Sequence, residues 1–489
     1  MLFNSYLYIF FFLPIVLVVY FSLNKTKNVR AGKVWLAIAS LYFYGFWNFS
    51  YVLLLVFSIF VNYTLGIFLS TKMESNTKNT FSRRYIVIIG IIFNIGLLAY
   101  YKYFNFFICT INNVFDSSIS TMNIVLPLAI SFFTFQQIAF LVDCYKLETK
   151  ENDFLSYCLF VTFFPRLIAG PIVYHKEIVP QFANPQRKIL NYKNLSFGIF
   201  LFFIGLFKKI VIADSFAACV KNGFDVAPFL NFFEAWISSL SYTLQIYFDF
   251  SGYTDMAIGS AYLFNIKVPK NFDSPYKALN IQEFWRRWHI TLSRWLVKYL
   301  YIPLGGNRRG IFRTLLNIFI TFLLCGIWHG AGWTFVVWGA MHGLGIVAYR
   351  IWRNVGVKLP KVVSWGLTFL YVNCAWVFFR AQNFSDAIKV LKGMCGLKGI
   401  VLPLPLERKL HLLKDYGISF GPWLKMIQED SRSLLYVLTG IMICVLFKNS
   451  LEIKKGITLN WYWAIGTSLI AVFSLMWLNK ESAFLYFQF

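Results

Sequence analysis

The chain has 489 residues, of which 58% are hydrophobic, 20% are aromatic and only 14% are charged. Soluble domains are close to half apolar and about a quarter charged, so this composition excludes a soluble enzyme, a disordered scaffold and a secreted disulfide-stabilised module. The net charge of +25 would suggest nucleic acid for a soluble protein. Here the basic residues fall between apolar runs, so membrane topology explains them. We expect a polytopic protein of the lipid bilayer with no nucleic-acid partner.

The apolar runs predict the membrane-spanning helices, because about 20 apolar residues in a helix cross the hydrocarbon layer. The first run lacks the basic start and the small-residue cleavage site of a signal peptide, so we expect a retained anchor. The predicted spans are residues 3–23, 34–47, 51–70, 85–101, 123–142, 196–216, 229–248, 312–328, 333–349, 362–379, 434–447 and 461–478.

Charge and helix-breaking residues predict the orientation and the irregular segments. Basic clusters follow the first and third spans, and basic loops favour the cytoplasmic side, so we expect both chain termini outside. Residues 154–174 contain two Pro-bearing breaks and are expected to form a re-entrant or broken helix, which is tolerated only where protein or water covers the backbone. Residues 381–433 have mixed polarity and predict a long surface loop or an interfacial element.

Residues 280–304 interleave aromatic and basic side chains. On one helix, the apolar members would form a single stripe, and the basic members would occupy much of the remaining surface. One interpretation is an interfacial helix with its tryptophans at headgroup depth. The second interpretation adds a role, in which the segment forms a basic, aromatic-lined entrance for an anionic, adenine-bearing donor from the cytoplasm. The two interpretations are compatible. The stripe is Trp285, Trp288, Leu292, Trp295 and Leu296, and the basic residues are Arg286, Arg287, Arg294 and Lys298.

Three of the five histidines stand out from their surroundings. His175 and His411 lie in polar loops, whereas His289 lies in the aromatic and basic segment. His329 ends an apolar run, and His342 lies beside a glycine in another. An ionisable side chain at membrane depth is costly and is expected to face a cavity and to be functional. For His329 we favour that interpretation, while for His342 a neutral imidazole that bridges two helices is the alternative.

Two further features concern acidic residues and the chain end. Asp249 and Asp255 lie at the end of an apolar segment, where we expect them to hold a kinked helix together through hydrogen bonds. The C-terminal end is aromatic instead of polar, so we expect it to dock into the protein or a partner, with the Tyr486 hydroxyl facing the same centre from outside. The eight cysteines show no metal-binding spacing, and no metal site is expected.

Seven stretches, in this order along nearly the whole chain, resemble the membrane-bound O-acyltransferase (MBOAT) family and, within it, the bacterial alginate and peptidoglycan O-acetyltransferase branch of the AlgI and PatA type. They are Phe3-Asn-Ser-Tyr-Leu-Tyr-Ile-Phe, Pro165-Arg-Leu-Ile-Ala-Gly-Pro, Tyr247-Phe-Asp-Phe-Ser-Gly-Tyr-Thr-Asp-Met-Ala-Ile-Gly, Glu283-Phe-Trp-Arg-Arg-Trp-His, Pro303-Leu-Gly-Gly-Asn, Trp328-His-Gly and Phe484-Leu-Tyr-Phe-Gln-Phe.

The resemblance implies an all-α polytopic membrane protein of the MBOAT fold, with a ring of about 11 transmembrane helices plus re-entrant and interfacial helices around a central tunnel. It divides the chain into N-terminal helices (1–122), a catalytic core with funnel and tunnel (123–380), and a C-terminal loop, last helices and aromatic tail (381–489). It implies that His329 is catalytic and that His289 lines the funnel. The implied substrate-binding residues are Trp285, Arg286, Arg287, Trp288 and Trp328, with Asp249, Asp255 and His342 in support.

The implied activity is that of an O-acetyltransferase of the bacterial cytoplasmic (inner) membrane. It takes acetyl from acetyl-CoA, with no bound cofactor, and His329 is the general base for the hydroxyl of Tyr486. An extracytoplasmic SGNH-type O-acetyltransferase partner then acetylates a polysaccharide, for which the residue usage of an AT-rich genome favours peptidoglycan. Alginate or another exopolysaccharide, a teichoic-acid D-alanyl transferase and a non-catalytic transporter are the alternatives; a transporter predicts two related halves, which the sequence lacks.

Overall fold

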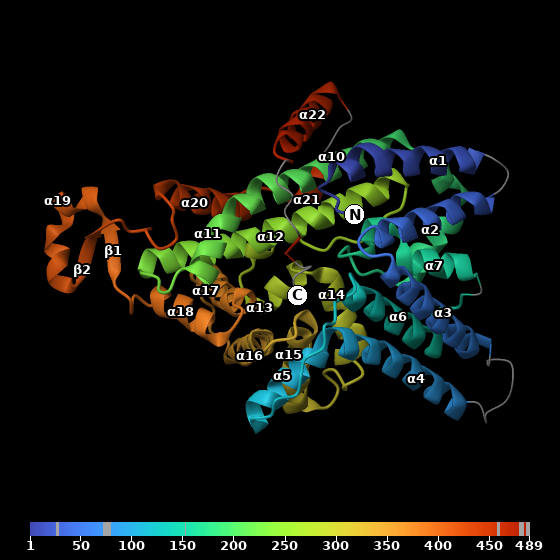
Figure 1. Ribbon diagram of the computed structural model, residues 1–489, viewed down its shortest axis with the longest axis horizontal. Coiled ribbons are helices and arrows are strands. Elements are labelled where there is room, and N and C mark those ends of the chain that lie inside the picture. The colour runs from blue at the N-terminus through green and yellow to red at the C-terminus, as the bar shows by residue number, and fades with distance from the viewer. Residues whose placement is uncertain (26–28, 72–79, 152, 457–459, 479–483, 486–489) are drawn as a thin grey trace.

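A computed structural model of the protein describes residues 1–25, 29–71, 80–151, 153–456, 460–478 and 484–485. Helices form one large body, and a small lobe containing β1, β2 and α19 projects from one end of it (Figure 1). Within the described part, seven helices are long and apolar enough to cross a membrane, and three shorter apolar helices accompany them. The prediction of a helical, multi-pass membrane protein is confirmed.

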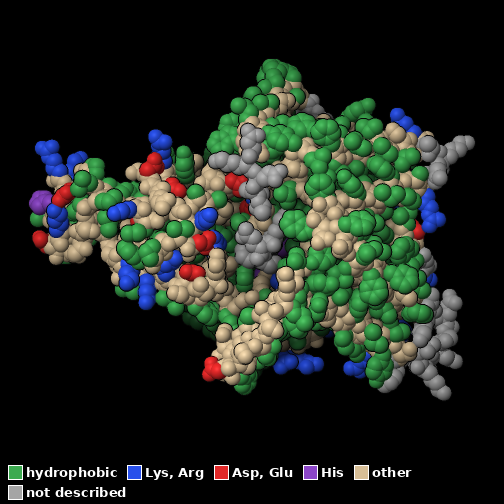
Figure 2. Space-filling model, in the orientation of Figure 1, with side chains coloured by type: hydrophobic (Ala, Val, Ile, Leu, Met, Phe, Trp, Pro, Cys, Tyr) green, Lys and Arg blue, Asp and Glu red, His purple; other side chains and the backbone are tan. Residues whose placement is uncertain are grey.

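The distribution of side chains on the surface fits this class. Figure 2 shows hydrophobic side chains over most of the body, while charged side chains gather on the projecting lobe and at the opposite edge. Many of the outward-facing side chains in the long helices are large and apolar, such as Phe57, Ile92 and Leu469. Such a surface is stable against lipid and not against water.

The N-terminal helices follow the predicted spans, with one extension. The span expected at 85–101 continues without a break to residue 115, because a π-helical turn at Ala99–Tyr103 joins α4 to α5. A second π-helical turn, Leu7–Phe12, leads into α1. The helices are α1 (Leu13–Lys25), α2 (Val29–Gly45), α3 (Ser50–Thr71), α4 (Thr80–Leu98) and α5 (Phe104–Phe115).

The central helices carry the predicted break at 154–174. Helix α7 ends at Thr162, the short α8 follows, and residues 168–174 are non-helical yet fully buried, so the expectation of a broken helix is confirmed. The span expected at 123–142 begins later, because residues 123–129 are not helical. The helices here are α6 (Ile130–Tyr145), α7 (Phe154–Thr162), α8 (Phe164–Leu167), α9 (His175–Ala183), α10 (Tyr192–Phe207) and α11 (Ala217–Lys221).

Helix α12 (Phe232–Leu263) is the buried axis of the molecule, and it corrects one prediction. The span expected at 229–248 is too short, so Asp249 and Asp255 lie inside a continuous helix and not at the end of an apolar segment. The helix packs directly on α10, where a Cβ atom on Gly252 would lie 2.6 Å from the Gly205 carbonyl oxygen. Small residues allow this approach of two helix backbones.

The segment 280–304 is not the single interfacial helix that we expected. It forms α13 (Ile281–Arg287) and α14 (Ile290–Leu296), followed by a π-helical turn. His289 separates them with a left-handed backbone, φ +42°. The aromatic stripe faces the protein interior and not the headgroups, because Trp285, Trp288 and Trp295 are all at most 6% exposed.

The remaining helices are α15 (Gly310–His329), α16 (Trp333–Val355), α17 (Lys361–Arg380), α18 (Phe384–Met394), α20 (Ser431–Leu446), α21 (Ser450–Lys455) and α22 (Trp461–Met476). Between α18 and α20, the region expected as a surface loop or interfacial element is the projecting lobe. It contains α19 (Glu407–Leu410) and a parallel two-stranded sheet of β1 (Ile400–Pro403) and β2 (Ile418–Gly421), with Ile400 opposite Ile418. This sheet is an exception to the all-α prediction.

Candidate active site

The antiparallel pair α15 and α16 positions two of the three histidines. The helices touch through glycines: a Cβ atom on Gly326 would lie 2.4 Å from the Phe335 carbonyl oxygen, and one on Gly339 would lie 2.5 Å from that of Phe322. Because these glycines precede the histidines by one helical turn, the close contact sets the positions of both. His329 is the last residue of α15, and His342 lies in the middle of α16.

The end of α15 is capped by two side chains from the α4–α5 junction. The Lys102 ammonium donates hydrogen bonds to the carbonyl oxygens of Trp328 and His329, at 2.8 and 2.9 Å. The Tyr103 hydroxyl donates to the Ile327 carbonyl at 2.7 Å. The last carbonyls of a helix have no partner within the helix, and a cation there also meets the negative end of its dipole. The cap therefore fixes the backbone of His329 and, with it, the position of the imidazole ring.

The His329 ring lies among aromatic rings and faces a second histidine. The ring centroids of Trp328, Trp338 and Phe379 are 4.8, 5.0 and 5.3 Å away. The His289 ring centroid is 6.5 Å away. At that separation, both imidazoles can face one reacting group placed between them. The two histidines that the resemblance implied for the site are thus brought together.

His289 is held on its other side by Asn271. The His289 Nδ1 atom lies 3.1 Å from Asn271 Oδ1, and the Phe250 ring packs perpendicular to the imidazole at a centroid distance of 4.9 Å. The side chain is fully buried, and this burial lowers the pKa of His289 to about 3. Since a desolvated imidazolium is disfavoured, His289 is neutral at cellular pH.

His342 is a bridge between two helices. Its Nδ1 atom accepts a hydrogen bond of 3.1 Å from the Trp285 indole nitrogen, which links α16 to α13. The Trp338 ring lies between the two histidines of this hairpin, 4.7 Å from His342 and 5.0 Å from His329. This geometry matches the alternative that the sequence left open for His342.

The predicted substrate-binding tryptophans lie in the aromatic interior. Trp328 stacks on Phe135, 4.8 Å between centroids, directly beside His329. Trp288 is 1% exposed and is enclosed by Phe284 and Trp376. Of these three tryptophans, only Trp285 lines a cavity of about 340 Å³.

Two cavities lie at opposite ends of the α15–α16 pair. One, of about 340 Å³, is lined by Trp285, Arg286 and Arg350 together with residues from the middle of α15. Three buried polar atoms of its wall have no hydrogen-bond partner among the described residues: Gln282 Oε1, Tyr301 Oη and Arg350 Nε. The other, of about 280 Å³, lies at the His329 end and is lined by Lys102, Gly330 and Phe335, among others.

The two predicted arginines have different surroundings. Arg286 is exposed on the wall of the 340 Å³ cavity. Arg287 pairs with the Glu283 carboxylate at 2.9 Å and donates to the Asp273 carbonyl at 3.0 Å. An arginine whose donors are already used holds α13 in place, so Arg286 and Arg350 are the better candidates for a phosphate.

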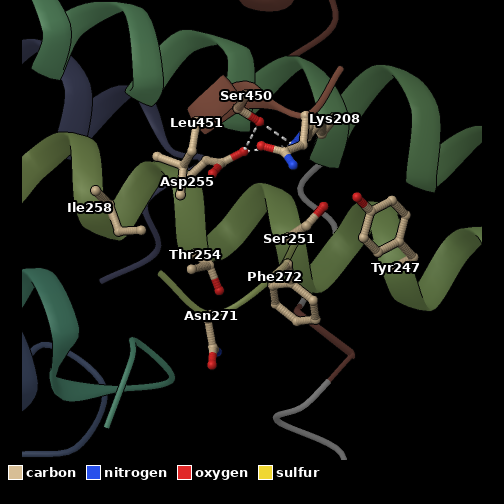
Figure 3. Close-up of a pocket in the computed structure, with 11 residues that line it drawn as sticks. Lys208, Tyr247, Ser251, Thr254, Asp255, Ile258, Asn271, Phe272, Ser450 and Leu451 are labelled. Atoms are coloured by element: carbon tan, nitrogen blue, oxygen red, sulfur yellow. Dashed lines mark hydrogen bonds and ion pairs between the residues drawn. The ribbon is translucent and has the colours of Figure 1, made fainter. Parts of the chain in front are cut away.

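Asp249 and Asp255 form buried ion pairs with two consecutive lysines that follow α10. Lys209 lies 2.7 Å from Asp249 and 3.0 Å from Asp214. Lys208 lies 2.7 Å from Asp255, and the Ser450 hydroxyl donates to the same carboxylate at 2.5 Å (Figure 3). The predicted structural role of both carboxylates is supported, but through ion pairs between helices and not through a kink within one.

The described part of the aromatic tail packs on α12 beside the histidines. Phe484 is 2% exposed, stacks on Tyr253 at 4.3 Å and contacts Phe250 at 5.7 Å. The Leu485 backbone amide donates to Asp249 Oδ2 at 3.0 Å. The prediction that this end docks into the protein is confirmed for these two residues. Tyr486 lies outside the described residues.

Sequence reasoning missed Lys102, the Lys208–Lys209 pair, Asn271 and the burial of His175. The two lysine sites carried a usable signal, because each interrupts an apolar run in the same way as the histidines. His175 was placed in a polar loop, but it is the first residue of α9 and pairs with Glu151 at 3.0 Å. Asn271 lies in an ordinary polar stretch, and only the tertiary structure brings it to His289. Among the described residues, no cluster of His, Cys, Asp or Glu could hold a metal ion.

A helical membrane body with two facing buried histidines defines an integral membrane protein with a candidate catalytic centre. Residues 145–384 match the MBOAT, membrane-bound O-acyltransferase family. The chain is 44% identical to the "Peptidoglycan O-acetyltransferase" of Helicobacter pylori, in an alignment that covers 100% of this chain and 98% of that one. It therefore belongs to the membrane-bound O-acyltransferase family, and it is an acyltransferase.

Two other similar proteins have different names and lower sequence identity to this chain. The "Probable alginate O-acetylase AlgI" of Pseudomonas aeruginosa is 37% identical, over 81% of this chain and 75% of its own. The "Teichoic acid D-alanyltransferase" of Bacillus subtilis is 26% identical, over 54% of this chain and 70% of its own. The similarity to the O-acetyltransferases thus extends over much more of the chain than that to the D-alanyltransferase.

Proposed function

We propose that this protein transfers acetyl groups from cytoplasmic acetyl-CoA across the bacterial cytoplasmic membrane, for the O-acetylation of peptidoglycan outside the cell. The observation that carries the proposal is the facing pair of His289 and His329 in an aromatic, buried centre. The choice of peptidoglycan is supported by the 44% identity over the whole chain to a protein of that name.

The 340 Å³ cavity is the proposed mouth for acetyl-CoA. Arg286 and Arg350 on its wall supply charge for the phosphates, and its apolar lining suits the pantetheine arm. The basic residues that flank α15 and α16 at this end favour the cytoplasmic side, which is where acetyl-CoA is found. The chain termini are then extracytoplasmic.

In the proposed reaction, His329 removes the proton of an incoming hydroxyl, and the oxygen attacks the thioester carbonyl carbon. The carbon–sulfur bond breaks, the imidazolium returns its proton to the departing sulfur, and CoA leaves as the free thiol. The acetyl ester therefore forms with no net change in protons on the enzyme. CoA stays on the cytoplasmic side, and only the acetyl group moves across the membrane.

The proposed acceptor is the hydroxyl of Tyr486, which an extracytoplasmic SGNH-type O-acetyltransferase would then unload. The packing of Phe484 and Leu485 supports this, because it anchors the chain one residue before Tyr486, on a helix whose Phe250 contacts His289. The tyrosine would form an acetyl-enzyme intermediate, and the partner would choose the final polysaccharide.

The test uses purified protein in nanodiscs with acetyl-labelled acetyl-CoA, and it follows CoA release and label on the chain. We expect label on the wild-type chain and none on His329→Ala or Tyr486→Phe. Full peptidoglycan O-acetylation in cells that carry Tyr486→Phe would overturn the relay, and activity of His329→Ala would overturn the site. Absence of turnover and of label, even with the extracytoplasmic partner added, would favour a carrier-dependent D-alanyl transferase or a transporter.

A further inference from the structure

The amide of Asn271 is fixed in one orientation by its neighbours. Its Oδ1 atom receives the Thr291 backbone N–H at 3.2 Å and the Thr291 hydroxyl at 2.9 Å. The Thr291 hydroxyl in turn accepts from the Ile172 backbone N–H at 3.0 Å, so its own hydrogen is directed at Asn271. A backbone N–H can only donate. The Asn271 atom at this point is therefore the carbonyl oxygen and not the amide nitrogen.

This orientation determines which nitrogen of His289 carries the proton. The Asn271 oxygen lies 3.1 Å from His289 Nδ1, and two acceptors cannot form a hydrogen bond, so Nδ1 must be protonated. A neutral imidazole has one N–H. The lone pair is then on Nε2, on the opposite side of the ring from Asn271.

We propose that Asn271 is a positioning residue that holds neutral His289 in its Nδ1–H tautomer. His289 then accepts a hydrogen bond or a proton at Nε2 in the reaction centre. It does not donate one to the thioester oxygen. This role rests on the proposed acetyl transfer, because only a reaction between the two histidines gives the tautomer a consequence.

The tautomer can be measured without any activity. Protein with ¹⁵N-labelled histidine in nanodiscs gives separate signals for protonated and unprotonated ring nitrogens, and a His289→Gln spectrum identifies those of His289. We expect Nδ1 protonated and Nε2 unprotonated in the wild type. A wild-type spectrum with the proton on Nε2 of His289 would overturn the proposal, even if every Asn271 variant failed to fold.

Variants connect the tautomer to the reaction. Asn271→Leu removes the acceptor, and we expect the tautomers to mix and kcat to fall about 10²-fold, the scale of general-base catalysis, with KM changed less than about threefold. Asn271→Asp keeps an oxygen for Nδ1–H and should recover most of kcat. The matched control is Asn373→Leu, which removes an equally buried amide that bonds to Thr243 and Ser239, away from the histidines.

Further outcomes separate the parts of the proposal. Equal losses of kcat in Asn271→Leu and Asn373→Leu, with an unchanged His289 spectrum, would reduce Asn271 to a packing role. If the wild type shows no acetyl transfer but has the expected spectrum, the proposed function fails and the tautomer assignment stands.

Discussion

Two buried polar clusters contact α12, and they accommodate buried polar groups in different ways. The ion-pair cluster consists of Lys208, Lys209, Asp214, Asp249 and Asp255, in which each carboxylate lies 2.7–3.0 Å from a lysine ammonium. The histidine centre consists of His289, His329 and His342, which are buried among aromatic rings. Burial in an apolar environment favours a neutral imidazole.

The difference separates structure from chemistry. A buried charge that is paired is held in one protonation state, so it connects helices and does not exchange protons. A neutral imidazole in an apolar site can both accept and release a proton during a reaction. The same burial therefore predicts a structural role for one cluster and a catalytic role for the other.

The ion-pair cluster is tested by removing one charge. Lys208→Met leaves the Asp255 carboxylate buried without its cation, and we expect a loss of about 3–5 kcal/mol in the free energy of unfolding, measured by denaturation in detergent. The double variant Lys208→Met/Asp255→Leu removes both charges and should recover most of that loss.

A matched control is available on the surface. Lys270 and Asp273 form an ion pair of the same 2.7 Å length, but their side chains are 51% and 32% exposed. Lys270→Met should therefore cost about 1 kcal/mol or less. Equal losses for Lys208→Met and Lys270→Met would contradict the distinction between the buried and the exposed pair.

The cap of α15 links the histidine centre to the membrane helices before it. Lys102→Met removes the donor to the Trp328 and His329 carbonyls, and we expect kcat to fall about 30-fold, because small displacements of a catalytic group have large effects. KM for acetyl-CoA should change less than about threefold. Tyr103→Phe removes only the neighbouring bond to Ile327 and should cost about threefold in kcat. A larger loss for Tyr103→Phe would contradict the role of Lys102.

Much of this architecture could be predicted from the sequence, because apolar length and glycine placement are local signals. The twelve predicted spans correspond to helices of the structure, and His329 was predicted as a site residue because an ionisable group ends an apolar run. Local signals fail where a polar residue finds its partner far along the chain. Asp249 looked like the end of a span, but Lys209 lies on a different helix and makes burial of both possible.

The prediction of a single interfacial helix over residues 280–304 was wrong for a related reason. An aromatic stripe with basic neighbours has the same pattern whether the tryptophans meet headgroups or the centre of a protein. In the structure, Trp376 of α17 packs on Trp288, and Trp338 of α16 packs on Trp285. These contacts show that the stripe faces the protein interior. The break at His289 also had no sequence signal, since neither glycine nor proline marks it.

Variants of the two arginines outside both clusters test which of them binds acetyl-CoA. Arg286 lines the 340 Å³ cavity with no ion pair found in the described part of the chain, so Arg286→Ala should raise KM for acetyl-CoA about tenfold with kcat within about twofold. Arg287 is bound to Glu283 and the Asp273 carbonyl. Arg287→Ala should lower thermal stability more than it raises KM, and the reverse pattern would return Arg287 to the donor site.

His342 is the sharpest test of the division, because it lies in the histidine centre but makes a structural contact. His342→Leu leaves the buried Trp285 indole N–H without its acceptor, which should cost about 1–3 kcal/mol of stability. Acetyl transfer, measured in the folded protein, should fall only about threefold. In Trp285→Phe/His342→Leu the donor is also removed, so the stability loss should be smaller than the sum of the single losses. A loss of activity as complete as that of His329→Ala would show that His342 takes part in the chemistry, and burial beside aromatic rings would then suffice to predict a catalytic histidine.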